Sequence, residues 1–233
     1  MKYLTLPDRC ERPLSFYLAM EEYAARRMDD DELFFMWQVG PSVIFGRHQV
    51  LENEVNTDYC RQHGIRLFRR KSGGGCVYAD RDNLMLSFIT REENVNLTFN
   101  KFVNMLLLVL RKLGVNAVGT THNDVMIGDS KVSGTAFYHL PGASIVHGTL
   151  LYDTNMEHMV HAITPSREKL QSKGIQSVRQ RITLLKDYVP LTLEELKAFI
   201  RTTLCEGERV LSASEVADIE ALERHNSLEH PLT

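Results

Sequence analysis

Cysteine is scarce in this 233-residue sequence, and its four copies lie far apart. They are Cys10, Cys60, Cys76 and Cys205, with no CxxC pair and no Cys–His spacing that would close a zinc site. The sequence therefore predicts neither a disulfide framework nor a structural metal. A single thiol could still act as a nucleophile.

Long apolar runs and an excess of either charge are missing as well. The longest apolar run, Met105 to Leu110, is far shorter than the roughly 20 residues that cross a bilayer, and acidic Glu11 precedes any signal-like apolar run. Lys and Arg number 27 against 30 Asp and Glu, so no basic field argues for nucleic acid. We therefore expect a cytoplasmic protein without a membrane or nucleic-acid partner.

The composition is that of an ordinary globular protein. Hydrophobic residues make up 43%, charged residues 24%, and the mean hydropathy is -0.22, which excludes a disordered chain and a collagen-like repeat. A chain of 233 residues can bury a sizeable core. No repeat, linker or low-complexity tract divides it, so one domain is expected.

Hydrophobic patterning predicts several helices. Good helix formers follow Pro13 over residues 14–28, and Glu21 and Glu22 of this helix should face solvent or a pocket rim. A second helix, over residues 99–113, carries an apolar stripe broad enough to be largely buried. Two later helices begin with capping signatures, Thr192 with Glu195 and Ser212 with Glu215.

Apolar runs between these helices predict strands. Those at 33–39 and 42–45, separated by Gly40-Pro41, indicate a hairpin. Further strands are predicted at 65–68 and 84–89, and three more at 125–127, 131–138 and 144–152, which would form a second, small sheet. Strands alternating with helices are typical of an α/β or α+β domain.

The most unusual stretch is Arg69-Arg70-Lys71, which leads into three glycines at 73–75. Such glycines permit positive φ and close approach of a ligand to the backbone, and the cations offer charge-assisted hydrogen bonds to phosphate or carboxylate. The pattern is neither a Walker A motif nor the dinucleotide-binding GxGxxG. It predicts an anion-binding loop, with a flexible basic hairpin as the alternative.

Three more segments carry polar side chains that could face a ligand. Lys131 opens a strand shortly after Asn123-Asp124, where it could serve a ligand or be a solvated strand-end cation. His147 lies in an apolar strand, where a hydrogen-bonded core histidine is the commoner outcome. The basic segment 172–181 could close over an anion or be a solvated loop.

Together and in order, these segments resemble the lipoate-protein ligases, which have the biotin and lipoate ligase fold. The resemblance runs from about residue 14 to residue 185. It rests on Trp37 with SVIFGR at 42–47, RRKSGGGCVY at 69–78, ND at 123–124, KVSGTA at 131–136, HGTLL at 147–151 and KGIQSVR at 173–179. It implies a class II synthetase-like α/β (α+β) fold, with a mixed central sheet plus a smaller sheet flanked by helices. It also implies a single catalytic domain over 1–233 without a separate C-terminal accessory domain.

The resemblance implies a two-step reaction that uses ATP and Mg²⁺. Lipoate and ATP would form lipoyl-adenylate, and the lipoyl group would pass to a lysine of a lipoyl domain, in 2-oxoacid dehydrogenase E2 subunits or the glycine cleavage H protein. Lys131 would be the catalytic cation that offsets charge on the acyl oxygen and the leaving adenylate. Asp124 would lie near the mixed anhydride, where it could hold Mg²⁺ or accept a hydrogen bond from the adenine side.

The resemblance also assigns the lipoate- and adenylate-binding positions. They are Arg69, Arg70, Ser72, Gly73, Gly74, Gly75, Val77, Tyr78, Asn83, Asn123, Asp124, Ser133, Gly134, Ala136, His147, Gly148, Thr149, Lys173, Gly174, Ser177, Val178 and Arg179. Residues 174–181 would form the adenylate-binding loop, as a lid. Walls of the acyl tunnel are expected from Trp37, Val43, Val77 and Val146.

Departures from the family pattern leave alternatives open. Cys76 stands where alanine is usual, and ADRDNL at 79–84 replaces a His-Asp-x-Gly-Asn-Leu stretch. Many bacterial relatives add a small accessory domain that assists adenylation. This chain could use a separate accessory subunit, work unaided, or act as a lipoyltransferase on preformed lipoyl-adenylate. An octanoyltransferase with a cysteine nucleophile is the other alternative, although the two expected nucleophile positions, within 119–122 and 164–166, hold no cysteine.

Overall fold

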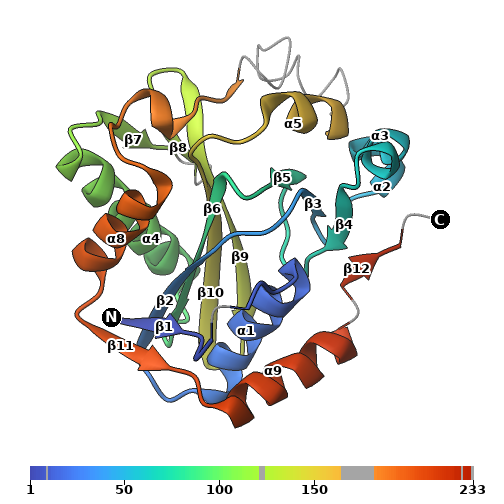
Figure 1. Ribbon diagram of the computed structural model, residues 1–233. Coiled ribbons are helices and arrows are strands. Elements are labelled where there is room, and N and C mark those ends of the chain that lie inside the picture. The colour runs from blue at the N-terminus through green and yellow to red at the C-terminus, as the bar shows by residue number, and fades with distance from the viewer. Residues whose placement is uncertain (9, 121–123, 164–180, 227, 232–233) are drawn as a thin grey trace.

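Two sheets organise the computed structural model, which describes residues 1–8, 10–120, 124–163, 181–226 and 228–231 (Figure 1). The large, eight-stranded mixed sheet has the order β11 (Gly207–Val210), β1 (Lys2–Thr5), β2 (Glu32–Trp37), β6 (Asn83–Thr90), β10 (Ala143–Leu151), β9 (Ser130–Leu140), β8 (Asp124–Ile127) and β7 (Ala117–Gly119). The small, four-stranded sheet has the order β12 (Glu229–His230), β4 (Arg66–Arg69), β3 (Ser42–Phe45) and β5 (Val77–Ala79). The predicted mixed sheet with a smaller sheet is therefore confirmed.

Helices pack against both sheets. They are α1 (Leu14–Arg27), α2 (Leu51–Glu54), α3 (Thr57–Gln62), α4 (Val95–Lys112), α5 (Met156–Ala162), the 3-10 helix η1 (Leu185–Asp187), α8 (Leu193–Leu204) and α9 (Ala213–Asn226). Figure 1 shows α1 and α9 on one side of the sheet and α4 and α8 on the other. None of the helices in the described ranges is long and apolar enough to cross a membrane.

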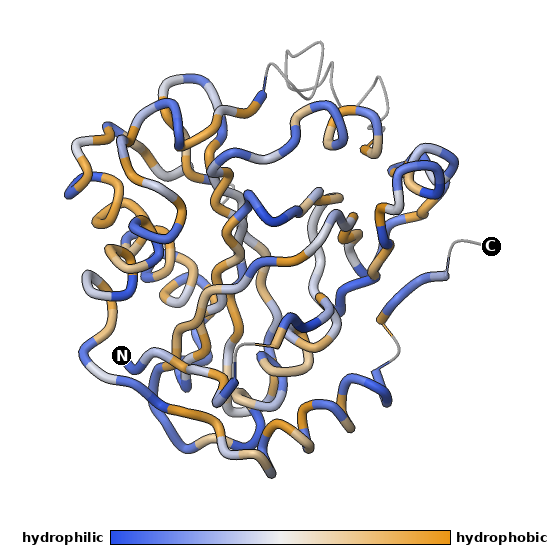
Figure 2. Tube along the Cα trace, viewed as in Figure 1, coloured by the Kyte–Doolittle hydropathy of each residue, from blue (hydrophilic) through white to orange (hydrophobic). Residues whose placement is uncertain are grey.

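Alternation along the strands divides the apolar residues between two cores. In β2, Phe35 and Trp37 pack with α1, whereas the alternate residues Phe34 and Met36 pack with α4, because successive strand residues point to opposite faces. Hydrophobic residues gather along these central strands in Figure 2. A third cluster lies between the small sheet and the helices α2, α3 and α5. The large sheet is thus buried on both faces.

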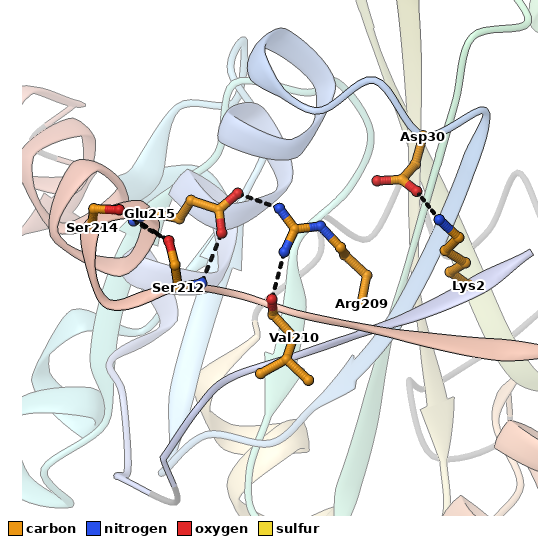
Figure 3. A network of polar contacts seen from close by, with 7 residues as sticks. All are labelled: Lys2, Asp30, Arg209, Val210, Ser212, Ser214 and Glu215. Carbon is orange, nitrogen blue, oxygen red and sulfur yellow. Dashed lines mark hydrogen bonds and ion pairs between the residues drawn. The ribbon is translucent and has the colours of Figure 1, made fainter.

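The helix predictions are confirmed with shifted ends. The second helix begins four residues early, at Val95, because the Asn94 side chain accepts hydrogen bonds from the amides of Asn96 and Leu97. Gly114, with φ of 78°, follows its C-terminus. Both capping signatures form: Thr192 and Glu195 exchange bonds at α8, and Ser212 and Glu215 do the same at α9, where Arg209 also binds Glu215 (Figure 3).

Two predictions about strand pairing are wrong. Runs 33–39 and 42–45 form no hairpin, because β2 pairs with β6 in the large sheet while β3 pairs with β4 and β5 in the small one. The strands predicted at 125–127, 131–138 and 144–152 are not a separate sheet, because β10 joins β6 along eight residue pairs. All four residues of β3 are buried, so its sequence holds no polar face that would indicate a partner.

Candidate ligand-binding and catalytic site

A cavity of about 590 Å³ lies between the two sheets. Its lining comes from both sheets, α1, α5 and the glycine loop, by which we mean residues 69–76. The lining residues are Leu18, Trp37, Ile44, Gln49, Glu54, Arg70, Gly74, Gly75, Cys76, Val77, Tyr78, Met85, Asp124, Lys131, Gly134, Thr135, Ala136, His147, Gly148, Thr149, Leu151, Met159, Ile163, Arg181 and Ile182. A volume of this size suits a small-molecule ligand.

One row of residues across five strands forms the cavity floor. Trp37, Met85, Thr149, Gly134 and Asp124 pair in register from β2 through β6, β10 and β9 to β8. Side chains at paired positions share a face, so the row runs from an aromatic and apolar end to a charged end. Glycine in the fourth position leaves open space in the middle of the floor.

Lys131 lies at the charged end of the floor. Its Nζ is 2.8 Å from Oδ1 of Asp124, and Nη2 of Arg181 is 3.9 Å from Oδ2 of the same carboxylate. A β-carbon on Gly134 would lie 2.5 Å from both Cε and Nζ of Lys131, so the lysine occupies the space that this glycine leaves. The Lys131 ammonium is therefore held in the cavity and is not a solvated strand-end cation.

Arg70 is a buried cation in the cavity wall. The residue is 5% exposed, and its guanidinium donates hydrogen bonds to the carbonyl oxygens of Ile44, Gly73 and Gly75. In the described ranges no ion pair joins it to a carboxylate. Burial lowers its pKa to about 10, which still leaves it charged near neutral pH. An uncompensated buried cation favours an anionic ligand beside it.

A chain of hydrogen bonds connects the aromatic end of the floor to the glycine loop. Trp37 Nε1 donates to Ser87 Oγ at 2.8 Å, which donates to Glu21 Oε1 at 2.5 Å. Glu21 Oε2 lies 2.9 Å from His147 Nδ1, and His147 Nε2 lies 2.9 Å from Ser72 Oγ. Both ring nitrogens of His147 are thus hydrogen-bonded, and its orientation in the cavity is fixed.

The expectation that Glu21 and Glu22 face solvent or a pocket rim is wrong. They are 3% and 5% exposed, because α1 packs them against the large sheet and the glycine loop. Lys71 does not supply the loop with an anion-binding donor either. Its ammonium points away from the cavity and binds Glu22 and Asn226.

Many of the predicted binding residues do meet in the cavity. These are Arg70, Gly74, Gly75, Val77, Tyr78, Asp124, Lys131, Gly134, Ala136, His147, Gly148 and Thr149. Asn123, Lys173, Gly174, Ser177, Val178 and Arg179 lie outside the described residues, as does most of the predicted lid. Arg181, at its end, reaches the lining.

Five predicted residues do not line the cavity, namely Arg69, Ser72, Gly73, Asn83 and Ser133. Arg69 donates to the carbonyl oxygens of Gly46, Arg47 and Gln49 and lies over the Phe45 ring. Asn83 and Ser133 are fully buried, and Asn83 donates to the Tyr78 carbonyl. Of the expected tunnel walls, Trp37 and Val77 line the cavity, while Val43 and Val146 are buried in the cores.

Sequence reasoning missed several lining residues, among them Leu18, Ile44, Met85, Leu151, Met159 and Ile163. Alternation could have found Met85, since it shares a strand face with Ser87. Ile44 and Leu151 lie within the motifs at 42–47 and 147–151. No local signal marks Leu18, Met159 or Ile163, because they come from different elements and are apolar like the core around them. Glu21 likewise looks like an ordinary surface residue in the sequence.

Comparison of the sequence with models of protein families shows to which family the chain belongs. The model described as the lipoyl protein ligase A/B catalytic domain matches residues 13–205. The chain belongs to this family. The lipoyl ligase family match includes the strands of the cavity floor and the glycine loop, whereas the edge strands β1, β11 and β12 lie outside it.

Curated members of the lipoyl ligase family are similar over much of the chain. Lipoate–protein ligase 1 of Staphylococcus aureus (strain Mu50 / ATCC 700699) is 38% identical over 191 residues, which are 80% of this chain and 58% of that protein. Lipoate-protein ligase LplJ of Bacillus subtilis (strain 168) is 36% identical over 187 residues, or 78% and 56%. The chain thus spans little more than half the length of these relatives.

Solved structures confirm the predicted lipoate ligase fold. A bi-partite lipoate protein ligase studied with its E2 lipoyl domain, from Thermoplasma acidophilum, matches with a TM-score of 0.80 and 27% identity, covering 96% of this chain and 90% of that one. A lipoate-protein ligase A bound with ATP matches with a TM-score of 0.77 and 25% identity, covering 96% and 92%.

Proposed function

We propose that this chain is a lipoate-protein ligase, which activates lipoate with ATP and transfers the lipoyl group to a lysine of a lipoyl domain. The shape of the cavity carries the proposal, because its floor runs from apolar Trp37 and Met85 to cationic Lys131, with buried Arg70 in the wall. This distribution suits an amphiphilic carboxylate with its apolar tail toward Trp37. The names of the curated relatives support the same substrate.

In the first step, a carboxylate oxygen of lipoate attacks the α-phosphorus of ATP, and pyrophosphate leaves. Negative charge on the reacting oxygens grows near the charged end of the floor. The Lys131 ammonium, held by Asp124, is the fixed cation that offsets it there. Arg70 keeps the Gly73 and Gly75 carbonyl oxygens turned toward its own guanidinium, so that they do not face the anion.

In the second step, the amine of the acceptor lysine attacks the acyl carbon of lipoyl-adenylate. The amide bond forms, AMP leaves with the bond electrons, and the amine gives up one proton. Lys131 again offsets the charge on the acyl oxygen and on the departing phosphate. The apolar end of the floor holds the acyl chain so that the carbonyl carbon meets the amine at the charged end.

Mg²⁺ would accompany ATP in this site. Within the described ranges, no group of three His, Cys, Asp or Glu side chains could hold a metal by itself. Asp124 is a carboxylate at the charged end of the cavity. Mg²⁺ usually takes one or two carboxylates together with substrate phosphates, so Asp124 and the phosphates of ATP would share the ion.

The acceptors would be lipoyl domains of 2-oxoacid dehydrogenase E2 subunits and the glycine cleavage H protein. Support for an E2 acceptor comes from the archaeal ligase studied with its own E2 lipoyl domain. Because that ligase is bi-partite, a separate accessory subunit is proposed as an aid to adenylation here. The single-domain organisation and the cytoplasmic location stay predictions.

The test is to incubate the purified chain with lipoate, ATP and Mg²⁺, and to search for lipoyl-adenylate by mass spectrometry. A lipoyl domain added next should gain the mass of one lipoyl group, and the same domain with its acceptor lysine changed to arginine should not. Transfer from lipoyl-adenylate without its formation from ATP would identify a lipoyltransferase. An acyl thioester formed without ATP would identify an octanoyltransferase and contradict the proposal.

A further inference from the structure

The glycine loop has a polar rear side, away from the cavity. A second, small cavity of about 20 Å³ lies there, and its lining includes Glu21, Glu22, Lys71, Ser72 and Asn226. Lys71 and Ser72 face this side and do not line the main cavity. These two loop residues are therefore placed to anchor the loop and not to contact a ligand.

Lys71 is the centre of a closed set of hydrogen bonds. Its Nζ lies 2.6 Å from Glu22 Oε2 and 2.8 Å from Asn226 Oδ1. Asn226 Nδ2 completes the triangle by donating to the same Glu22 oxygen at 3.1 Å. Glu22 Oε1 accepts a bond from Arg26 Nε, so both oxygens of this carboxylate, whose side chain is 6% exposed, have partners. We call Glu22, Lys71 and Asn226 the rear clasp.

Asn226 reaches the loop because the C-terminal segment returns to the small sheet. Beyond α9, the Leu228 carbonyl accepts the Arg69 amide at 2.9 Å, directly at the base of the glycine loop. Glu229 and His230 then pair with Phe68 and Leu67 as an edge strand. All of these C-terminal residues lie beyond 13–205, the part matched by the family model.

A loop with three consecutive glycines needs such an anchor. Gly73 and Gly75 have no atom within 4 Å of where a β-carbon would stand, so packing does little to restrict them. An unrestrained loop would visit many conformations, and ordering it costs free energy when a ligand binds. If only part of the population has the competent conformation, the apparent affinity falls by that fraction.

We infer that the rear clasp holds the glycine loop in its ligand-binding conformation, which makes Asn226 and Glu22 positioning residues that act through Lys71. Neither side chain lines the main cavity. This inference rests on the proposed function only for the identity of the anion. It assigns to the C-terminal segment a role in substrate binding as well as in folding.

The test uses Asn226→Ala in the full chain, with Glu220→Ala as the matched control. Glu220 also lies on α9 and also ties it to the rest of the molecule, through Arg12, but it does not reach the loop. Two measurements are made for each variant: the Kd for lipoate by calorimetry, and hydrogen exchange across residues 72–76 without ligand. Lys71→Gln serves as a second variant that breaks the same triangle.

We expect Asn226→Ala to weaken lipoate binding by about three- to tenfold and to speed loop exchange, while Glu220→Ala changes neither. In the ligase assay the KM for lipoate should rise and kcat at saturation should stay constant. Wild-type binding and exchange in both Asn226→Ala and Lys71→Gln would overturn the positioning role and leave the proposed function standing. If the wild type binds no lipoate but Asn226→Ala still speeds exchange, the ligand assignment fails and the clasp is supported.

Discussion

The floor and the glycine loop enclose the same cavity, but different forces hold them in place. Floor residues belong to strands joined by continuous backbone ladders, with β10 paired to both β6 and β9 along eight residue pairs each. Side chains of the loop fix it to distant segments: Arg70 donates to the Ile44 carbonyl oxygen, Lys71 binds Glu22, and Ser72 binds His147. Removing one side chain from the floor should therefore alter the chemistry of the site, whereas removing one from the loop should alter the loop's geometry.

The largest expected effect is at the floor. Lys131→Ala should lower the rate of lipoyl transfer by about 100-fold, because the reacting oxygens lose their fixed cation. The melting temperature should change little, since the side chain borders the open cavity and belongs to no hydrophobic cluster of the described ranges. Single-turnover transfer measures the rate, and thermal unfolding measures the melting temperature. Lys186→Ala removes a lysine outside the cavity as a control, and wild-type turnover of folded Lys131→Ala would exclude this role.

The loop should be most sensitive where it meets its neighbour. A β-carbon at Gly46 would lie 2.3 Å from the Gly74 carbonyl oxygen, so Gly46→Ala must displace the loop backbone. We expect a loss of about 1–3 kcal/mol in the free energy of unfolding, together with weaker lipoate binding. Gly40→Ala, with nothing within 4 Å, is the control. Equal urea midpoints for the two variants would contradict the close contact.

Gly46→Ala affects backbone, whereas the corresponding change in the floor affects a side chain. In Gly134→Ala the new β-carbon would meet Cε and Nζ of Lys131 at 2.5 Å, and the flexible ammonium can swing away. Stability should hold, and turnover should fall by about tenfold as the cation moves. The losses of turnover caused by Gly134→Ala and Lys131→Ala should not add. In a Lys131→Ala background, Gly134→Ala should lower turnover no further. Additive losses would show that Gly134 acts by another route.

The rear clasp gives the glycine loop a pH dependence through Glu22. Burial alone would raise the pKa of Glu22, but Lys71, Arg26 and Asn226 hold it below its usual 4.5. A carboxyl with a lowered folded pKa stabilises the fold above its unfolded pKa, and this contribution is lost as the pH falls through the folded pKa.

Glu22→Gln should therefore be less stable than the wild type by about 1–2 kcal/mol at pH 7. The difference should shrink as the pH falls below 4.5, where the wild-type carboxyl becomes protonated too. Urea unfolding of both proteins from pH 7 down to pH 3 measures the gap. A gap that does not vary with pH would mean that the charge of Glu22 does not stabilise the fold.

The smallest effect is expected at Cys76, which lines the cavity from the loop. Cys76→Ser should keep its turnover, because a route through an adenylate requires no thioester. Intact mass after incubation with lipoate and ATP gives the check. An acyl adduct on Cys76 that disappears together with activity in the variant would support the thioester class.

Local chemistry made much of the fold predictable. Periodicity located α1 and α4 and most of the strands, and Thr192 with Glu195 marked the start of α8, since these signals lie within a few residues of one another. The shorter helices α2, α3 and α5 were not predicted. Strand pairing was not predictable, because the buried run 42–45 shows no face that selects between the two sheets. Partner choice depends on segments far along the chain.

The same distinction applies to the candidate site. Resemblance identified the loop and Lys131, because they form contiguous motifs. Glu21 was expected at the surface because its partner His147 lies 126 positions away, and Asn226 was not predicted because Lys71 is 155 positions away. Such residues look like ordinary surface polar groups until the fold brings them together.

The aromatic end of the floor has a consequence for spectroscopy. Trp37 is the single tryptophan of the chain, it lines the cavity, and its ring stacks on Tyr17 with centroids 4.9 Å apart. Indole emission responds to changes in polarity and contact around the ring. When tryptophan is excited selectively, the emission therefore reports on the cavity wall alone. The unlabelled protein thus carries its own fluorophore, and titrating a ligand while recording emission would follow occupancy of the cavity directly.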